Sequence, residues 1–534
     1  MSRVTMTAVV LALAPAAAQA QDGKVQKQIT PYVELNQVLL ADLQNDDVTT
    51  YTSIAAGVDA QIATRRVQGQ VSYRYEHRFA YEDDLADDSV HSGLARVAVQ
   101  ANRLLSFEAG ALAARARTDI RGAALGTSGA GDVKNTSQIF SAFAGPNLST
   151  QVGDTSISAA YRFGYNKVES SETITGVPAN QQPLDLFDSS TTHLATISVG
   201  SRPGTVLPIG LTANATWARE DASQLDQRFD DKFLRLDAVA PLSRELAIVG
   251  GVGYEKLEIS QRDAVVDATG APVLDSNGRF ITDESSPRRL AYETDGLFWD
   301  AGVMWRPSPR TSLEARVGQR YDTTIYTGTM SHQISQTSGF AVGVYNTVQS
   351  FGRGVNDTLA TLPTSFESQA DPFGNQFGGC VFGNSGARAG GCFNPVLNAI
   401  TTANFRARGV DGVLSTEVDA WRVGFGAGYA NRRFLVPIGD ALFGTADELY
   451  YAQALFGRDL TRRSSVNLNV YGTYTDSGLL GAPDVWGTGA NGSYNYSFGR
   501  FGAVASAGIF ASDVEGPGGK DALAQAALGM RYSF

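Results

Sequence analysis

Four histidines could take part in acid–base or metal chemistry: His77, His91, His193 and His332. A hydrolase built on a Ser–His–acid or Asp–His arrangement needs a histidine beside its partners at one place in the fold. None of the four stands in a recognisable catalytic motif, and no histidine–cysteine group has the spacing of metal ligands. The sequence therefore predicts no catalytic residue, no cofactor, no metal site and no enzyme. It favours histidines in an aromatic band or a polar interior.

Charged residues of both signs recur on one face of their segments. Rings of charge select ions in pores. Pairs of opposite charge also stabilise a polar interior, because an isolated buried charge is costly. Both roles stay open, with pairing favoured, for the interior charges that we predict: Arg74, Glu76, Arg78, Arg162, Arg235 and Asp237.

A separate acidic run covers Glu82–Asp88. Its carboxylates are ligands of the kind that Ca²⁺ prefers, but the run lacks the glycine and terminal glutamate of an EF-hand loop. Two interpretations remain, a calcium site and a solvated external loop. We favour the loop.

The two cysteines, Cys380 and Cys392, each follow a pair of glycines. In an exported chain an even pair at this spacing predicts a disulfide, with a reactive thiol pair as the alternative. They lie in the longest stretch without strand character, Gly352–Arg408. A connection of this length is usually functional or disordered. We hypothesise a plug or constriction inside the fold, and an external surface loop is the equal alternative.

The chain begins with the parts of a secretory signal peptide. Arg3 precedes a short apolar core, and Ala18-Gln19-Ala20 has the small residues of a cleavage site. We expect cleavage after Ala20, with residues 21–27 as a short N-terminal segment. Loss of Arg3 leaves 42 basic against 54 acidic residues, a net charge of −12. This charge argues against nucleic-acid binding, and the mature chain has no apolar run that would span a membrane as a helix.

Long alternating segments follow the signal peptide. Val67–Glu82 alternates over sixteen residues, with Val71, Tyr73 and Phe79 on one face and Arg74 on the other. Period-two alternation predicts a β-strand, and this one exceeds the usual length of strands in soluble domains. An apolar face with aromatic residues toward the strand ends is typical of a lipid-facing barrel wall, with the polar face lining the lumen.

Connections between these segments alternate between short and long. Barrels of the outer membrane have short periplasmic turns and long external loops. We therefore predict one all-β domain over residues 28–534, an antiparallel up-and-down transmembrane barrel of about 22 strands. The count falls to 18 or 20 if the weaker segments Ile325–Ser335 and Gly409–Val418 do not span. The predicted location is the outer membrane of a Gram-negative bacterium.

The C-terminal segment ends with Tyr532 and Phe534 on its apolar face. It resembles the C-terminal β-signal that the barrel-assembly machinery reads, so this machinery and the lipid bilayer are predicted partners. A TonB-dependent transporter is excluded at this stage, because such receptors carry a globular plug before the first strand, and here the first strand begins near Gln28. An ordinary porin has ~16–18 strands, fewer than expected here.

Three further segments resemble a known family: Ile29–Tyr32, Trp305–Leu313 and Phe405–Val410. They look like the large outer-membrane β-barrel family found beside exosortase and exopolysaccharide gene clusters. Similar sequences often carry the name of the preprotein translocase subunit YajC, a small protein with one membrane helix that this chain lacks. The resemblance implies an envelope role, with polysaccharide export components as partners. It transfers no catalytic residue.

Two functions follow from these observations. The first is a channel or export barrel for small solutes or secreted polysaccharide, with residues 352–408 as its plug. The second is a non-conducting structural or assembly barrel of the envelope that supports exopolysaccharide or surface-layer export.

Overall fold

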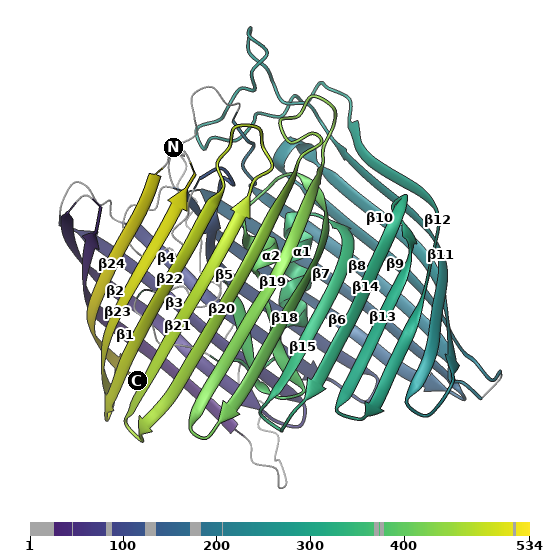
Figure 1. The fold of residues 1–534 in the computed structure, drawn as a ribbon, viewed down its shortest axis with the longest axis horizontal. Helices are drawn as coiled ribbons and strands as arrows, with labels where there is room; N and C mark the ends of the chain where they lie inside the picture. Colours follow the sequence, from purple (N-terminus) through teal and green to yellow (C-terminus); the bar gives the residue numbers. More distant parts are fainter. Residues whose placement is uncertain are drawn as a thin grey trace.

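Figure 1 shows the computed structural model, which describes residues 26–534 except 45, 82–87, 123–134, 171–182, 205–206, 368–372, 374–378 and 516–518. The predicted signal peptide and Glu82–Asp87 of the acidic run lie outside the described residues. No helix in the part of the chain described has the length and hydropathy needed to span a membrane.

Twenty-two strands form one antiparallel sheet. The first fifteen are β1 (Gln26–Asp42), β2 (Asp47–Ala63), β3 (Val67–Ala80), β4 (Asp88–Gln100), β5 (Leu105–Arg117), β6 (Thr136–Val152), β7 (Thr155–Ser170), β8 (Ser189–Ser201), β9 (Gly210–Ala222), β10 (Arg228–Pro241), β11 (Leu246–Gln261), β12 (Arg289–Ser308), β13 (Thr311–Arg320), β14 (Thr323–Gln333) and β15 (Gly339–Gln349). A 3-10 helix (Gln224–Asp226) lies between β9 and β10. The remaining seven strands are β18 (Asn404–Val418), β19 (Trp421–Leu435), β20 (Ala446–Thr461), β21 (Ser464–Asp476), β22 (Val485–Phe498), β23 (Phe501–Val514) and β24 (Gly519–Ser533).

Each strand pairs with its neighbours along the chain, and the first strand pairs with the last. Tyr32 of β1 lies opposite Ser533 of β24, and Asp42 lies opposite Leu523. The ring therefore closes on itself through the pairing of β1 with β24. The all-β antiparallel fold and the count of 22 strands are confirmed, and the two weaker segments correspond to β14 and β18.

The alternation seen in the sequence sets the two faces of this sheet. On β12, Leu297 is 80% exposed on the outer face, whereas Phe298 is 3% exposed on the inner face. Residues of opposite parity point to opposite sides because side chains alternate along a strand. Apolar side chains therefore cover much of the outside of the ring, and polar side chains line much of its inside.

Connections at one edge of the ring are short, and several at the other edge are long. The long ones include residues 262–288 between β11 and β12 and 436–445 between β19 and β20. In Figure 1 the long connections lie at the top, and the C-terminus lies at the opposite edge. The longest connection, residues 350–403, joins β15 to β18. Asn404–Arg408, which the sequence pattern assigns to this connection, already pair with β19.

Candidate functional site inside the ring

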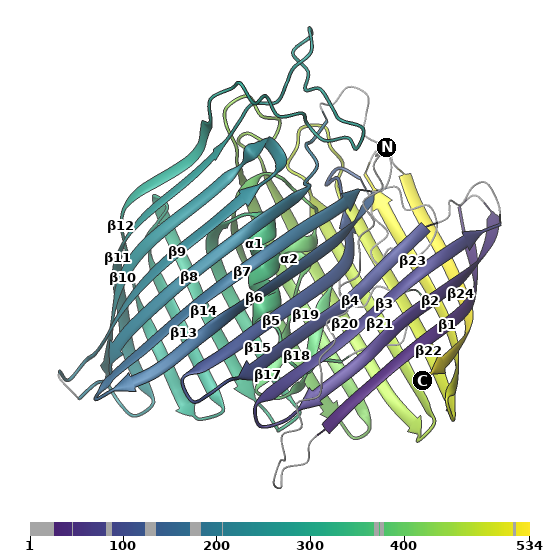
Figure 2. The same ribbon diagram turned by 180° about the vertical axis from the view of Figure 1, so that it is seen from behind.

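Residues 350–403, called the insert below, fold into the interior of the ring. The insert contains helix α1 (Phe351–Thr361), strands β16 (Cys380–Ser385) and β17 (Arg388–Cys392), and the short helix α2 (Asn394–Leu397). Both helices stand between the front and back walls in the two opposite views of Figures 1 and 2. Of the two locations left open by the sequence, the interior is the one observed.

Helix α1 packs its apolar face on the wall near β4–β6. Ser350 caps its N-terminus by accepting a hydrogen bond from the Arg353 amide, which satisfies one of the free amides of a first helical turn. Buried residues at helical spacing, Phe351, Val355 and Leu359, join one apolar cluster with wall residues Leu94, Leu112, Ile139 and Phe143. Burial of each such side chain contributes ~1.5–3 kcal/mol.

Polar contacts fix the same helix along β6–β9. Asn356 accepts a hydrogen bond from Ser141 (3.0 Å) and donates one to Thr192 (3.1 Å). Arg162 of β7 forms an ion pair with Asp357 at 2.7 Å. The predicted interior charge Arg162 therefore serves to hold the insert.

The cysteine hairpin lies on the opposite part of the wall. Cys380 and Cys392 are joined by a disulfide and face each other across the β16–β17 pair. The Cys380 amide donates a hydrogen bond to Gln453 Oε1 of β20 at 2.7 Å. Gly426 of β19 passes so close that a side chain there would overlap Cys380 Sγ. The hairpin thus depends on a wall position without a side chain.

A third set of contacts joins the end of the insert to two separate parts of the ring. Arg117 of β5 donates hydrogen bonds to the Asn398 carbonyl (3.0 Å) and Oδ1 (2.8 Å). The same guanidinium donates to Thr475 Oγ1 of β21 at 3.1 Å. Strands β5 and β21 lie eight strands apart around the ring. The insert is therefore anchored across the lumen.

Two networks of interior charge lie on different arcs of the ring. On β10–β13, Arg235 contacts Asp237 (2.7 Å) and Asp300 (2.6 Å), and Arg316 contacts the same two carboxylates at 2.9 and 2.8 Å. Arg320 binds Glu255 through two hydrogen bonds of 2.6 Å. Arg235 and Arg316 are 18% and 15% exposed, so this network meets the interior space.

The second network lies on β24 and β1–β3. Arg74 contacts Glu34 at 3.0 Å and also pairs with Glu76, and Arg78 contacts Glu76 at 3.1 Å. Arg531 of β24 extends it to Glu34 at 3.6 Å. The structure thus brings Arg74, Glu76 and Arg78 together, as it does Arg235 and Asp237, and every predicted interior charge has a partner of opposite sign.

Several members of these networks were missed from the sequence. Asp300 stands between Trp299 and Ala301, two apolar residues of the outward-facing set. Because side chains alternate along a strand, its position in the alternation, or parity, predicts that Asp300 faces inward. The same parity argument applies to Arg316 and Glu255. Their partners, however, depend on the stagger between strands, which a local pattern does not contain.

The histidines lie among aromatic rings on the outer face. The His91 ring is 4.9 Å from Tyr75 and 5.2 Å from Phe140, and the His193 ring stacks 6.2 Å from Trp217. Across the described ranges, no group of three or more His, Cys, Asp or Glu has an arrangement for a metal ion. At the C-terminus, the centre of the Tyr532 ring lies 5.0 Å from that of Phe501 and 5.1 Å from that of Phe534.

Comparisons with known proteins yield matches in structure alone. No family model matches the chain, and no curated protein sequence matches it. Among solved structures, the ferric-catecholate import receptor Fiu from E. coli K12 is 10% identical, with a TM-score of 0.43 and coverage of 94% of this chain and 81% of that one. The iron transporter FrpB from Neisseria meningitidis is 10% identical, with a TM-score of 0.40 and coverage of 95% and 82%. The siderophore receptor PirA from Acinetobacter baumannii is 10% identical, with a TM-score of 0.38 and coverage of 96% and 81%.

The resemblance to the exosortase-associated barrel family is wrong by these comparisons, since the matching structures are iron and siderophore receptors. The three segments that suggested it lie in β1, at the β12–β13 turn and in β18. Amphipathic strands and tight turns of this kind occur in any large barrel, so they carry information about the fold and none about the family.

Proposed function

We propose that this protein is an outer-membrane transport barrel that passes small polar solutes through its lumen, with the insert as an internal constriction. The observation that carries the proposal is that the insert is anchored to separate parts of a closed 22-strand ring, on β5 and on β20 and β21. A ring of this size encloses a wide space unless something fills it. The insert narrows that space.

The exterior of the ring supports a membrane location. Exposed apolar residues such as Leu297 (80%) and Leu528 (70%) face outward. Aromatic side chains form an arc near each edge, and membrane barrels carry such girdles of aromatic residues at both interfaces. One arc contains Tyr429, Tyr450, Tyr474 and Trp486, and the other contains Tyr496, Phe498, Phe501, Tyr532 and Phe534.

The lengths of the connections support an orientation. Short turns face the periplasm in such barrels and long loops face outward, so residues 262–288 and 436–445 are external. Phe534 then lies at the periplasmic edge, which suits recognition by the barrel-assembly machinery.

A route for solutes is favoured along β10–β13. The described contacts of the insert are mainly with two arcs of the ring, one running from β24 through β1 to β9 and the other from β18 to β21. The charge network of Arg235, Asp237, Asp300 and Arg316 lies outside these arcs and is partly exposed to the interior. Paired charges of both signs suit hydrated polar solutes without strong preference for one ion.

Planar-bilayer conductance of the refolded mature protein tests this function. The informative variant replaces residues 351–403 with a short Gly/Ser linker, since Gln349 and Phe405 are already paired neighbours. We expect discrete conductance steps for the native chain and larger steps for the variant. Reduction of the disulfide should raise the conductance of the native chain.

Heat-modifiable gel mobility serves as the control for folding in every case. Equal conductance of the native chain and the folded variant would contradict the constriction. Silence of both folded proteins would favour the structural role, a closed envelope barrel without transport.

A further inference from the structure

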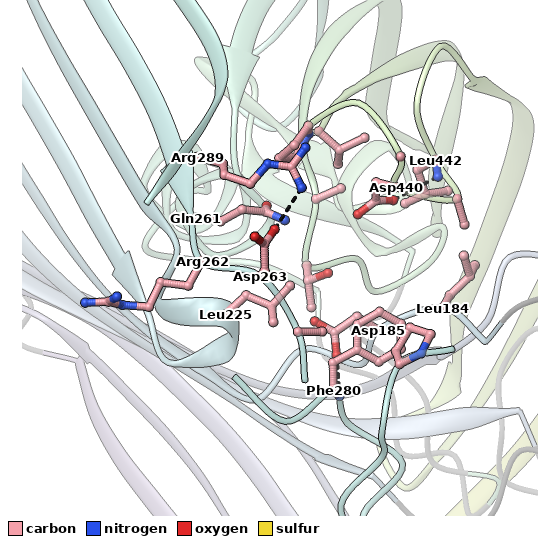
Figure 3. Close-up of a pocket in the computed structure, with 18 of the residues that line it drawn as sticks. Leu184, Asp185, Leu225, Gln261, Arg262, Asp263, Phe280, Arg289, Asp440 and Leu442 are labelled. Atoms are coloured by element: carbon pink, nitrogen blue, oxygen red, sulfur yellow. Dashed lines mark hydrogen bonds and ion pairs between the residues drawn. The ribbon is translucent and has the colours of Figure 1, made fainter. Parts of the chain in front are cut away.

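A pocket of about 140 Å³ lies at the edge of the ring that carries the long connections. Its lining comes mainly from three of these connections, represented by Asp185, Phe280 and Asp440, with Leu225 of the 3-10 helix and with Thr402 and Ala403 at the end of the insert. Figure 3 shows Asp185, Phe280 and Asp440 on separate loops around the pocket. The pocket is distinct from the charge networks inside the ring.

Asp185 is the most unusual polar group of this lining. Its Oδ1 accepts hydrogen bonds from the Phe280 amide (2.9 Å) and from Gln224 Nε2 (2.8 Å). Its Oδ2 is buried and has no hydrogen-bond partner among the described residues. A buried acceptor without a partner costs ~1–3 kcal/mol, so the ionised form of this carboxyl is disfavoured until a hydrogen-bond donor or a cation comes near it.

The charges of the lining leave an excess of carboxylate. Arg289 already donates hydrogen bonds to Asp263 (2.8 Å) and to the Ile438 carbonyl (2.8 Å). Arg262 extends away from the other labelled residues in Figure 3 and pairs with Asp226 at 3.1 Å. Within the described part of the chain, neither Asp185 nor Asp440 forms an ion pair. The lining therefore attracts a cation when Asp185 is ionised.

Apolar side chains decide which kind of cation fits. Leu184, Phe280 and Leu442 contribute to the lining, and the described residues hold no metal-binding group of three or more His, Cys, Asp or Glu. A bare metal ion gains little from hydrocarbon walls, whereas an organic ion buries its own apolar surface against them. We propose that this pocket binds an alkylammonium group, with its charge near Asp185 and Asp440 and its hydrocarbon part on the apolar lining.

Binding at this place would also touch the insert. Thr402 and Ala403 line the pocket, and Ala403 belongs to the apolar cluster that contains Phe405, Phe434 and Leu442. A ligand in the pocket therefore contacts the end of the insert as well as the outer loops. The binding itself does not depend on whether the lumen conducts.

The pH dependence of binding follows from the state of Asp185. Burial raises the pKa of this carboxyl to about 8, and the charge of Asp440 adds to the rise. Below that pKa a proton must leave before the ammonium binds, so affinity should fall by up to ~10-fold per pH unit. An alkylammonium, like a lysine side chain, keeps its charge to pH ~10. The other charged groups around Asp185 are Asp263, Arg262, Arg289, Arg279 paired with Asp188, and Arg432 paired with Asp447.

Titration calorimetry of the refolded full-length mature protein with butylammonium chloride tests the proposal. We expect saturable binding that strengthens between pH 6.5 and 8.5 and weakens by ~10-fold or more in Asp185→Asn and in Asp440→Asn, because each loses a charge partner. Glu515→Gln is the matched control, since Glu515 is an exposed carboxylate at the same edge outside the pocket. It should bind as the native protein does.

Two comparison probes separate the alternatives. 1-Butanol has the same hydrocarbon chain without the charge, and equal binding of butanol would overturn the role of the carboxylates. Calcium chloride tests a metal site, and displacement of butylammonium by stoichiometric Ca²⁺ would overturn the assignment to an organic cation. Unchanged affinity in both aspartate variants would overturn the location.

Discussion

Arg117 and Asn398 meet inside the ring through two hydrogen bonds, although 281 residues separate them along the chain. Arg117 belongs to the wall and Asn398 to the insert. Both also contact Thr475 Oγ1, at 3.1 Å in each case. This three-residue contact attaches the C-terminal end of the insert to two separate parts of the barrel wall.

Arg117→Met should loosen the insert without opening the barrel. Loss of hydrogen bonds from a charged donor costs ~1.5–3 kcal/mol each at most, and the strand pairing of β5 is unaffected. We expect noisier single-channel current with more frequent high-conductance intervals. Arg103→Met, at an exposed short turn, is the control and should leave the current unchanged. A single-channel current from folded Arg117→Met protein with no more noise and no more high-conductance intervals than the native protein shows would contradict the anchoring role.

Asp300→Asn should shift the ion preference of the lumen toward anions. Asp300 is 5% exposed and bridges Arg235 and Arg316, so its neutralisation leaves two guanidinium groups with less compensating charge. A change of ~0.7 kcal/mol in the energy of a passing ion corresponds to about a threefold change in permeability ratio. The reversal potential in a salt gradient measures this ratio.

The comparison for that experiment is Asp230→Asn, which removes a carboxylate paired with Lys232. Asp230 lies on the outer face, so the reversal potential should not move. Equal shifts in both variants would indicate a general effect of net charge and would contradict the proposed solute route along β10–β13.

Gly426→Ala should displace the cysteine hairpin. The added Cβ would overlap Cys380 Sγ, and rigid strand backbone leaves little room for adjustment. We expect increased protease cleavage within residues 380–392 and higher conductance. Gly472→Ala is a matched control on a neighbouring part of the wall, because its Cβ would find Thr488 Cγ2 at 3.9 Å, an ordinary contact. Equal cleavage of the two variants would show that the hairpin adapts.

Local patterns in the sequence were sufficient for the strands and insufficient for the interior contacts. The alternation of Val67–Glu82 predicted β3 to within two residues, because the period of side chains along a strand is a local property. The interior position of the insert was left open, since Gly352–Arg408 contains no signal that separates a lumen from a surface. The contact of Arg117 with Thr475 depends on closure of the whole ring.

The pocket at the outer edge was missed for a related reason. Asp185, Phe280 and Asp440 belong to three connections far apart in sequence, and each looks like an ordinary loop residue by itself. Their convergence follows from the order of strands around the ring. The family resemblance failed because short amphipathic segments recur wherever the barrel fold does.

Rising pH should destabilise the packing of the outer loops through Asp185. The pKa of this carboxyl is raised to about 8 by burial, whereas an unfolded aspartate titrates near ~3.9. The packed state therefore binds more protons than the unpacked state between these values, and its stability falls as pH increases from ~4 to ~8. Hydrogen exchange of the Phe280 amide, which donates to Asp185 at 2.9 Å, should show decreasing protection after correction for intrinsic rates. Asp185→Asn retains an oxygen acceptor and removes the titration, so its protection should stay level, and a parallel decline in Asp185→Asn would assign the pH effect to another group.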